Sequence, residues 1–301
     1  MFEKSDQAIA DALVLLYKLP DDAMDSIRVA MQRAGLTFAD AALHTGIATQ
    51  GELDEAYSWV RRQSQRQGRS LVEEALHRQS SQRALTVWEG DRVVPGQALL
   101  LANQPDSPHS ETVRTLRTEL LMRTSGRRGA AIFALLSPGQ QEGRSQLCAE
   151  LAIAFAQLGG RTLLVDADMR RPRQHVLFGC DNDIGLAQAL VDSNSLRIRR
   201  VEGFENMGLL PSGCLPPNPL ELLSGPRFER LVGDWRRSYE FVLVDTPPVG
   251  QYSDGLTVAT AAGSVIVLGR RNITSFSAMS ELQRKVENTY ARVVGAVLNQ
   301  F

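Results

Sequence analysis

From residue 130 onward, short apolar runs alternate with longer segments whose apolar positions recur at helical spacing. The runs are apolar at consecutive positions, which is typical of strands covered on both faces, and we expect strands at 131–136, 162–165, 207–210, 241–244, 265–268 and 293–298. Helices are expected at 145–158, 220–235 and 277–288. This alternation predicts an α/β fold with a doubly wound parallel sheet, in which ligands bind at the carboxyl ends of the strands.

Residues 1–90 follow a different pattern, in which apolar residues lie on helical stripes. The stripes hold Ala8, Ala12, Leu15 and Leu16, and then Ile27, Ala30 and Met31. A weak repeat relates residues 32–44 to 65–77, which share Gln-Arg-x-Gly and Ala-Leu-His in register. We therefore expect a small helical module at 1–90, a linker with turn-forming residues at 91–109, and an α/β domain at 110–301 that begins with a helix.

The first expected strand runs into the loop Ser-Pro-Gly-Gln-Gln-Glu-Gly-Arg-Ser at 137–145 and then into a helix. This context suits a phosphate-binding loop, because backbone N–H groups and a helix N-terminus favour an anion. Against the pattern GxxxxGK[ST], Gly143 and Ser145 fit, whereas Pro138 and Arg144 replace Gly and Lys. Taken alone, the degenerate motif suits a plain strand–loop–helix turn equally well. The residues expected to contact a nucleotide are Gly139, Glu142, Gly143, Arg144, Ser145 and Gln146.

Three aspartates follow expected strands at the same edge of the sheet as this loop. Asp166 and Asp168 follow the second strand, and Asp245 follows the apolar run 241–244. A single aspartate at such a place is often only a helix cap or a turn former. Three of them beside a phosphate loop indicate binding of Mg²⁺ and a nucleotide. We expect Ser145, Asp166 and Asp245 to be the metal ligands.

Charge and composition narrow the classes of function. The 301 residues hold 33 basic and 34 acidic side chains, a net charge of −1, which predicts no nucleic-acid partner. No apolar run approaches the ~18 residues of a membrane span, and no signal peptide opens the chain, so we expect a cytoplasmic protein. Cys148, Cys180 and Cys214 lie far apart without CxxC spacing, which favours neither a disulfide framework nor a zinc site.

With these motifs in this order, residues 107–301 resemble the bacterial protein-tyrosine kinases of exopolysaccharide and capsule synthesis. The resemblance rests on the phosphate loop, on Asp-Ala-Asp-Met-Arg-Arg-Pro at 166–172 and on Val-Asp-Thr-Pro-Pro at 244–248. Two further segments fit, Pro-Pro-Asn-Pro-Leu-Glu-Leu-Leu at 216–223 and Glu-x-x-Arg-x-x-Arg at 111–117. The sequence is most similar to the branch associated with chain-length-determinant proteins.

The resemblance implies an ATP-dependent protein-tyrosine autokinase that regulates exopolysaccharide chain length and export. The fold implied is a P-loop sheet like that of the MinD and ParA ATPases, and the cofactors are ATP and Mg²⁺. Asp166 would be the general base and a metal ligand, Asp168 and Arg144 would support the transfer, and Asp245 would complete the metal shell. Arginines 170, 171 and 173 would reach phosphate or a neighbouring subunit, although a solvated basic turn is the simpler interpretation.

The resemblance also implies partners. Glu111, Arg114 and Arg117 would join subunits of a homo-oligomeric ring, although their spacing also suits an exposed helix with an intrahelical Glu–Arg pair. A separate membrane-embedded polysaccharide co-polymerase would recruit the kinase to the inner face of the cytoplasmic membrane. Residues 34–56 are weakly similar to the helical domain of type II secretion and pilus assembly ATPases, and a generic helical docking domain fits them as well.

Two departures from the family keep other functions open. Family members usually carry a C-terminal tyrosine cluster, whereas the tyrosines here are scattered as Tyr17, Tyr57, Tyr239, Tyr252 and Tyr290. Arginine at position 144 instead of lysine leaves open a nucleotide-gated scaffold without kinase activity. A MinD/ParA-like ATPase switch is a third hypothesis, in which the signature lysine of that class is replaced here by Gly139.

Overall fold

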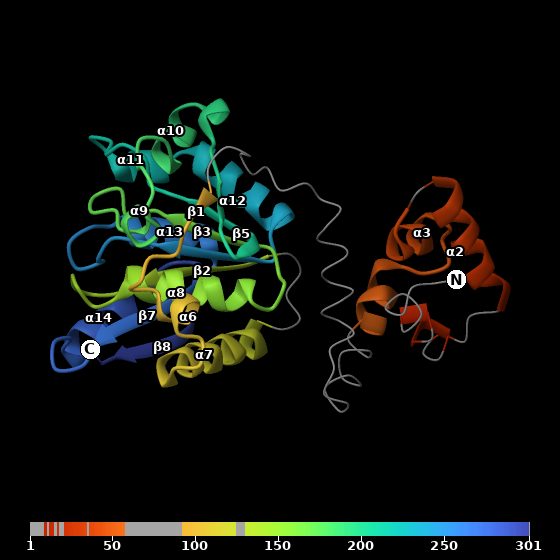
Figure 1. Cartoon of the computed structure of the whole chain (residues 1–301), viewed down its shortest axis with the longest axis horizontal. Coiled ribbons are helices and arrows are strands. Elements are labelled where there is room, and N and C mark those ends of the chain that lie inside the picture. The colour runs from red at the N-terminus through yellow and green to blue at the C-terminus, as the bar shows by residue number, and fades with distance from the viewer. Residues whose placement is uncertain are drawn as a thin grey trace. The chain divides into compact units, whose positions relative to one another are not determined.

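The computed structural model describes residues 9–10, 12–14, 17, 21–34, 36–57, 92–124 and 130–300. The chain divides into two compact units, Met1–Arg83 and Ala84–Phe301. Their elements are drawn in Figure 1, in colours that run from red at the N-terminus to blue at the C-terminus. None of the helices in the described ranges is both long enough and apolar enough to cross a membrane.

The N-terminal unit contains α2 (Asp21–Ala34) and α3 (Phe38–His44) packed around a small apolar core. Ile27, Phe38 and Leu53 are buried in it, and Ala30 and Met31 pack against it, as the second stripe predicts. The Thr37 side chain caps α3 by accepting a hydrogen bond from the N–H of Asp40. The first copy of the repeat thus covers the end of α2 and all of α3, whereas the second copy, 65–77, lies outside the described residues, as do Ala8, Leu15 and Leu16.

The second unit holds an eight-stranded sheet with helices between the strands. Its strands are β1 (Arg92–Val93), β2 (Ala131–Leu136), β3 (Thr162–Asp166), β4 (Arg199–Val201), β5 (Phe204–Leu210), β6 (Phe241–Asp245), β7 (Ser264–Arg270) and β8 (Arg292–Asn299). Its helices are α6 (Leu100–Asn103), α7 (Pro108–Thr124), α8 (Arg144–Ala156), α9 (Gln174–Leu177), α10 (Leu186–Val191), α11 (Pro219–Leu223), α12 (Pro226–Ser238), α13 (Asp254–Ala262) and α14 (Phe276–Glu287), with a 3₁₀ turn at Ser193–Ser195.

The strands lie in the order β1-β4-β5-β3-β6-β2-β7-β8, and of the pairs described only β4–β5 is antiparallel. The expected doubly wound parallel sheet is confirmed, with one antiparallel pair, β4–β5, that the sequence did not predict. β1 and β4 were not expected, because each has only two or three residues and most of these are arginine. β4 and β5 form a tight hairpin in which Gly203 takes φ +80°, a left-handed conformation that favours glycine.

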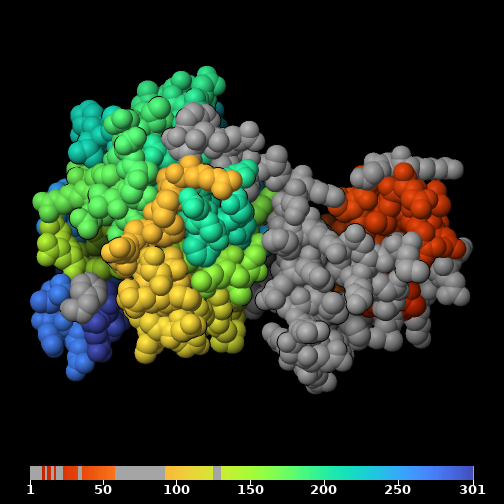
Figure 2. All heavy atoms as spheres, in the orientation of Figure 1, coloured from red at the N-terminus to blue at the C-terminus, as the bar shows by residue number. Residues whose placement is uncertain are grey.

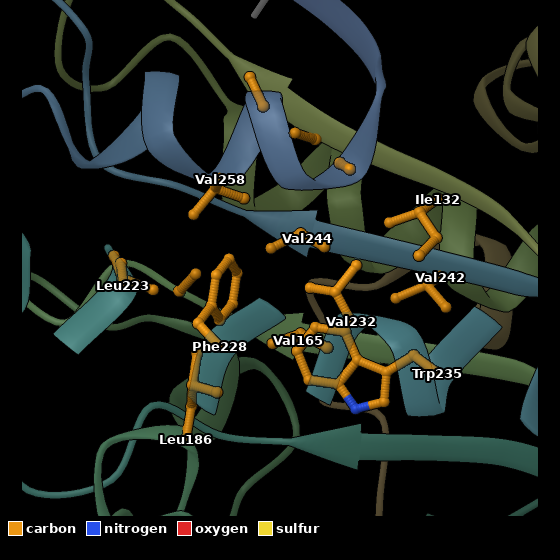
Figure 3. Packing of buried hydrophobic residues seen from close by; sticks show 14 of the residues in the cluster. Ile132, Val165, Leu186, Leu223, Phe228, Val232, Trp235, Val242, Val244 and Val258 are labelled. Carbon is orange, nitrogen blue, oxygen red and sulfur yellow. The ribbon is translucent and has the colours of Figure 1, made fainter. Parts of the chain in front are cut away.

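Side chains alternate between the two faces of the sheet and build a core on each. On one face Ile132 and Ala134 of β2 pack with α12 and α13, and on the other Phe133 and Leu135 pack with α8. Figure 3 shows the first core, where Phe228, Val232 and Trp235 point from α12 toward strand residues such as Val165 and Val244. Both faces of the central strands are therefore covered, and only their ends are open to a ligand.

Two segments differ from the sequence-based expectation. The segment 91–109, expected as a linker, supplies β1, which pairs with β4, and α6, which packs on α8. In Figure 2 this orange-yellow stretch lies against the surface of the second unit. The helix expected at 220–235 is two helices, α11 and α12, because the chain turns at Gly225 and restarts at Pro226, whose fixed φ suits the first turn of a helix.

Candidate functional site

The loop at 137–143 joins β2 to α8 at the carboxyl edge of the sheet. Gln141 and Gly143 take positive φ values of 55° and 96°, which turn the chain back toward the start of α8 at Arg144. The free N–H groups of the first helical turn therefore lie beside the loop. Pro138, which replaces the first glycine of the motif, accepts a hydrogen bond from the N–H of Gly250 at 2.9 Å and so joins the loop to the segment after β6.

The Arg144 side chain lies inside this loop and is only 7% exposed. Its Nε donates to the carbonyl oxygen of Thr246 at 2.7 Å, and its Nη1 donates to the carbonyl oxygen of Gly139 at 2.9 Å and to Ser137 Oγ. Its Nη2 lies 3.9 Å from Asp168 Oδ2. The structure thus brings Arg144 and Asp168 together, and protein acceptors engage three sides of the guanidinium group.

Glu142 is buried behind the loop, at 3% exposure. One carboxylate oxygen accepts the N–H of Gly139 at 2.8 Å, and the other accepts the hydroxyl of Thr274. Its main-chain carbonyl accepts the side-chain amide of Asn299 at 3.1 Å. A negative carboxylate is unsuited to a phosphate ligand, so the Glu142 side chain holds the loop from behind. Gly139 lies so close to it that a Cβ there would approach Glu142 Oε1 to 3.2 Å.

Asp166 and Asp245 end β3 and β6 as register partners, and both are fully buried. Asp166 Oδ2 accepts the N–H groups of Arg173 at 3.0 Å and Gln174 at 2.9 Å, while Oδ1 accepts that of Asp168 at 3.1 Å. Asp245 Oδ2 accepts the Gln174 side-chain amide at 2.8 Å. The two neighbouring strand ends thus place two carboxylates side by side, as the sequence predicts.

Burial, followed by the negative charge of Asp245, raises the pKa of Asp166 well above its usual range. Burial likewise raises the pKa of Asp245 to about 6, against the opposing charge of Arg144 and the nearby Ser145 hydroxyl. Both shifts have the same physical origin, because desolvation and a neighbouring like charge penalise an ionised carboxylate. A cation at this place would relieve both penalties.

The donor set fits Mg²⁺. Within the described part of the chain, Asp245 Oδ1 is buried without a hydrogen-bond partner, which leaves one carboxylate oxygen available to a ligand. Ser145, at the start of α8, supplies a hydroxyl beside it. The described residues contain no group of three or more His, Cys, Asp or Glu side chains that could hold a metal by themselves. Mg²⁺ suits such a site because it commonly takes one or two carboxylates and completes its shell with water and phosphate.

The basic turn after β3 is tied to the protein at two of its arginines. Arg170 forms a two-point ion pair with the buried Asp254, at 3.2 Å for each contact, and lies 4.1 Å above the centre of the Tyr252 ring. Arg171 donates to the side chain of Gln140 in the phosphate loop at 2.6 Å. These contacts join the turn to the loop and to the segment after β6, so this turn is more than a solvated basic surface.

Gln146 lies on α8 but does not face the loop. Its amide donates to the carbonyl oxygen of Ala98 at 2.6 Å and to Glu150 at 3.2 Å. On α7, Arg114 pairs with Glu111 at 3.3 Å within the helix, and Arg117 donates to the carbonyl oxygen of Ala154 at 2.9 Å. The segment expected to join subunits therefore does form a helix, but Arg117 uses its side chain for a contact within the same chain.

Sequence reasoning missed three side chains that organise the site. Gln174 bridges Asp245 and the main chain of Ser145, and Thr274 holds Glu142. Glu150, buried in α8, accepts the N–H groups at 100 and 101 and so fixes the start of α6. Of the three, only Glu150 left a signal in the sequence, because an acidic residue stands among the apolar residues 147–156. The other two depend on contacts between distant segments.

The fold and this edge define a P-loop nucleotide-binding protein of the α/β class. Comparisons with known proteins narrow this class. The chain is 35% identical over 207 residues to the putative tyrosine-protein kinase EpsB of Ralstonia nicotianae, covering 68% of this chain and 27% of that protein. It is 30% identical over 203 residues to the tyrosine-protein kinase YwqD of Bacillus subtilis, covering 67% of this chain and 85% of that protein. No family model matches the sequence.

Solved structures agree with these relatives. The chimerical protein CapA2B2 superposes with a TM-score of 0.62 at 31% identity, covering 75% of this chain and 98% of the other. The kinase domain of the Escherichia coli tyrosine kinase Etk superposes with a TM-score of 0.63 at 29% identity, covering 67% and 79%. The chain belongs to the family of bacterial protein-tyrosine kinases. It spans 27% of the length of the first curated relatives that it matches.

Proposed function

We propose that this chain is an ATP-dependent protein-tyrosine kinase that regulates the chain length and export of an exopolysaccharide. The names of its relatives support the reaction class. The observation that carries the proposal is the buried pair Asp166 and Asp245 beside the phosphate loop, with Asp245 Oδ1 available to a ligand within the described residues. Burial of two neighbouring carboxylates costs stability even beside the charge of Arg144, and binding of Mg²⁺ with a nucleotide is the chemistry that would offset this cost.

Ser145, Asp166 and Asp245 would hold Mg²⁺, which neutralises phosphate charge when it is bound. The backbone of the loop and the N-terminus of α8 bind the phosphate groups of ATP. Asp166 takes the proton of the tyrosyl hydroxyl on its Oδ1 atom. This oxygen has more accepting capacity left, because it accepts one N–H group whereas Oδ2 accepts two. Arg144 holds the loop and Asp168 in place and adds positive charge next to the phosphates.

A second candidate function is a nucleotide-gated scaffold without phosphoryl transfer. The observation that favours it is the engagement of Arg144 by the carbonyl oxygens of Gly139 and Thr246 and by the hydroxyl of Ser137. An arginine held in this way contributes charge but does not reach a transferred phosphoryl group without breaking those contacts. The two candidates agree on nucleotide binding and differ only in transfer.

The proposal extends to assembly and location. The part of α7 that carries the exposed Glu111 and the half-buried Arg114 would join copies of the chain in a ring. A separate membrane-embedded co-polymerase would recruit the kinase to the cytoplasmic face of the membrane.

Intact-mass spectrometry of the full chain after incubation with Mg·ATP tests the proposal. We expect a mass gain of one or more phosphoryl groups on tyrosine, abolished by Asp166→Asn while binding of a fluorescent ADP analogue persists. Asp181→Asn, at an exposed carboxylate, is the matched control and should keep the gain. Nucleotide binding without a mass gain, and without phosphorylation of an added tyrosine-containing copolymer, would favour the scaffold instead.

A further inference from the structure

The five tyrosines of the sequence differ sharply in their surroundings. Tyr239 is buried at 5% exposure, and the hydroxyl of Tyr17 donates to Glu55 in the N-terminal unit. Tyr57 is half-buried and packs against the core of that unit. Tyr252 is half-buried beneath the guanidinium group of Arg170. Tyr290 stands apart from these four, since it is 96% exposed.

Tyr290 lies at the tip of the turn between α14 and β8, and this turn is well defined. The Thr289 hydroxyl donates to the carbonyl oxygen of Val286 at 2.7 Å and accepts the N–H of Ala291 at 3.1 Å. The turn therefore presents the Tyr290 ring to solvent from a fixed base. Such a side chain can enter the site of another molecule at little cost, because it has little packing to lose and its anchor is already ordered.

Tyr290 cannot reach the nucleotide site of its own chain. Register pairs link Asp245 through β2 and β7 to Gly295 on β8, so these two residues lie at the same level of the sheet. Tyr290 precedes Gly295 by five residues, which places it about 16 Å toward the opposite edge, and three strand spacings add about 14 Å sideways. A separation of about 20 Å on a rigid sheet excludes transfer within one chain.

We propose that Tyr290 is the tyrosine acceptor of this kinase and that a second copy of the chain phosphorylates it; this inference rests on the proposed function. The Tyr290 Oη attacks the γ-phosphorus of ATP bound to the second copy. A bond forms between Oη and phosphorus, the bond to the bridging oxygen of the β-phosphate breaks, and its electron pair leaves with ADP. The hydroxyl proton is taken up in the site of that second copy.

The first test maps phosphotyrosine in the full chain, treated with a phosphatase and then with Mg·ATP. We expect phosphate on Tyr290, its loss in Tyr290→Phe, and its retention in the matched control Tyr57→Phe, which changes a tyrosine of the N-terminal unit. The two variants Tyr290→Phe and Asp166→Asn should also complement each other in a mixture. The Tyr290→Phe chain keeps Asp166 and should phosphorylate Tyr290 of the Asp166→Asn chain, and the different masses of the two chains show which one gains phosphate.

Several outcomes would overturn this assignment. Phosphate on Tyr17, Tyr57 or Tyr252 that persists in Tyr290→Phe would move the acceptor elsewhere. An Asp166→Asn chain that gains no phosphate in the mixture would indicate transfer within one chain. Phosphorylation of a glutamate–tyrosine copolymer without self-phosphorylation would support the kinase function and contradict the assignment of Tyr290 as an acceptor. If neither the chain nor the copolymer gains phosphate, the proposed function fails, and the acceptor site fails with it.

Discussion

Asp166 and Asp245 are register partners at the last paired position of two neighbouring parallel strands, and both side chains are fully buried. The sheet therefore forces two carboxylates together where neither can reach solvent. Backbone N–H groups and the Gln174 amide satisfy part of their hydrogen-bonding capacity, but they carry no full positive charge. The site carries an electrostatic penalty that a bound cation would release, and this relationship gives the first prediction.

Asp245→Asn should stabilise the metal-free protein at pH 7 and abolish its stabilisation by Mg²⁺. The pKa of Asp245 is raised to about 6 in the folded chain, so the folded state binds a proton that the unfolded state has lost between about pH 4 and pH 6. The free energy of unfolding therefore falls as the pH rises through this window. Asparagine does not titrate, so the variant lacks this loss of stability. We expect a gain of about 1–3 kcal/mol at pH 7 in urea denaturation with EDTA, since a tenfold change in a protonation equilibrium is about 1.4 kcal/mol.

Arg144→Met should lower the free energy of unfolding by about 3 kcal/mol, because it leaves buried acceptors at Thr246, Gly139 and Ser137 without their donor. Arg144→Lys keeps a charged donor and should cost only about 1 kcal/mol. Denaturation curves of the two variants at equal pH measure the difference. Equal stability of both variants and the unchanged protein would show that these contacts do not hold the loop.

Thr274→Val should weaken the binding of Mg·ADP about tenfold, because the buried Glu142 carboxylate loses a donor and the phosphate loop loses its support from behind. Thr274→Ser keeps the hydroxyl and should restore the affinity. Thr260→Val, which removes an exposed hydroxyl from α13, is the matched control. Titration with a fluorescent ADP analogue gives the dissociation constants, and a Thr274→Val value equal to that of the control would contradict the role of Glu142.

We expect Arg117→Ala to lower the stability of the single chain and Arg114→Ala to affect only the assembly of copies. Arg117 donates to a main-chain oxygen of α8, so its loss should lower the free energy of unfolding of the single chain by about 1 kcal/mol. Arg114 makes an ion pair within α7, and its loss should cost less than about 0.5 kcal/mol. If α7 joins subunits, sedimentation velocity should show smaller particles for Arg114→Ala at unchanged stability. An unchanged sedimentation profile would show that Glu111 and Arg114 form only an ion pair on the surface of α7 and do not join subunits.

Periodicity alone predicts the central sheet well, for a physical reason. Strands covered on both faces need consecutive apolar residues, as in β2 and β6, and this pattern is visible in the sequence without any knowledge of partners. The convergence of Asp166 and Asp245 follows as well, because parallel strands end at one edge. The register that makes them direct neighbours depends on strand order, which no local pattern specifies.

The elements that sequence reasoning missed depend on tertiary contacts. β1 and β4 have too few apolar residues to show a strand period, and they exist because β5 and each other satisfy their backbone groups. Thr274 and Gln174 act on residues more than 70 positions away, so their spacing carries no motif. The break at Pro226 had a local signal in its proline, which the apolar spacing of the segment outweighed.

Glu150 links α8 to α6 through its buried side chain. It lies six residues along α8 from Arg144, about 9 Å along the helix axis, and its carboxylate grips the two amides that begin α6. The helix that starts at the phosphate loop therefore also fixes the start of α6, which follows β1 in the chain. A displacement of α8 at the phosphate loop would therefore reach α6 through one buried carboxylate.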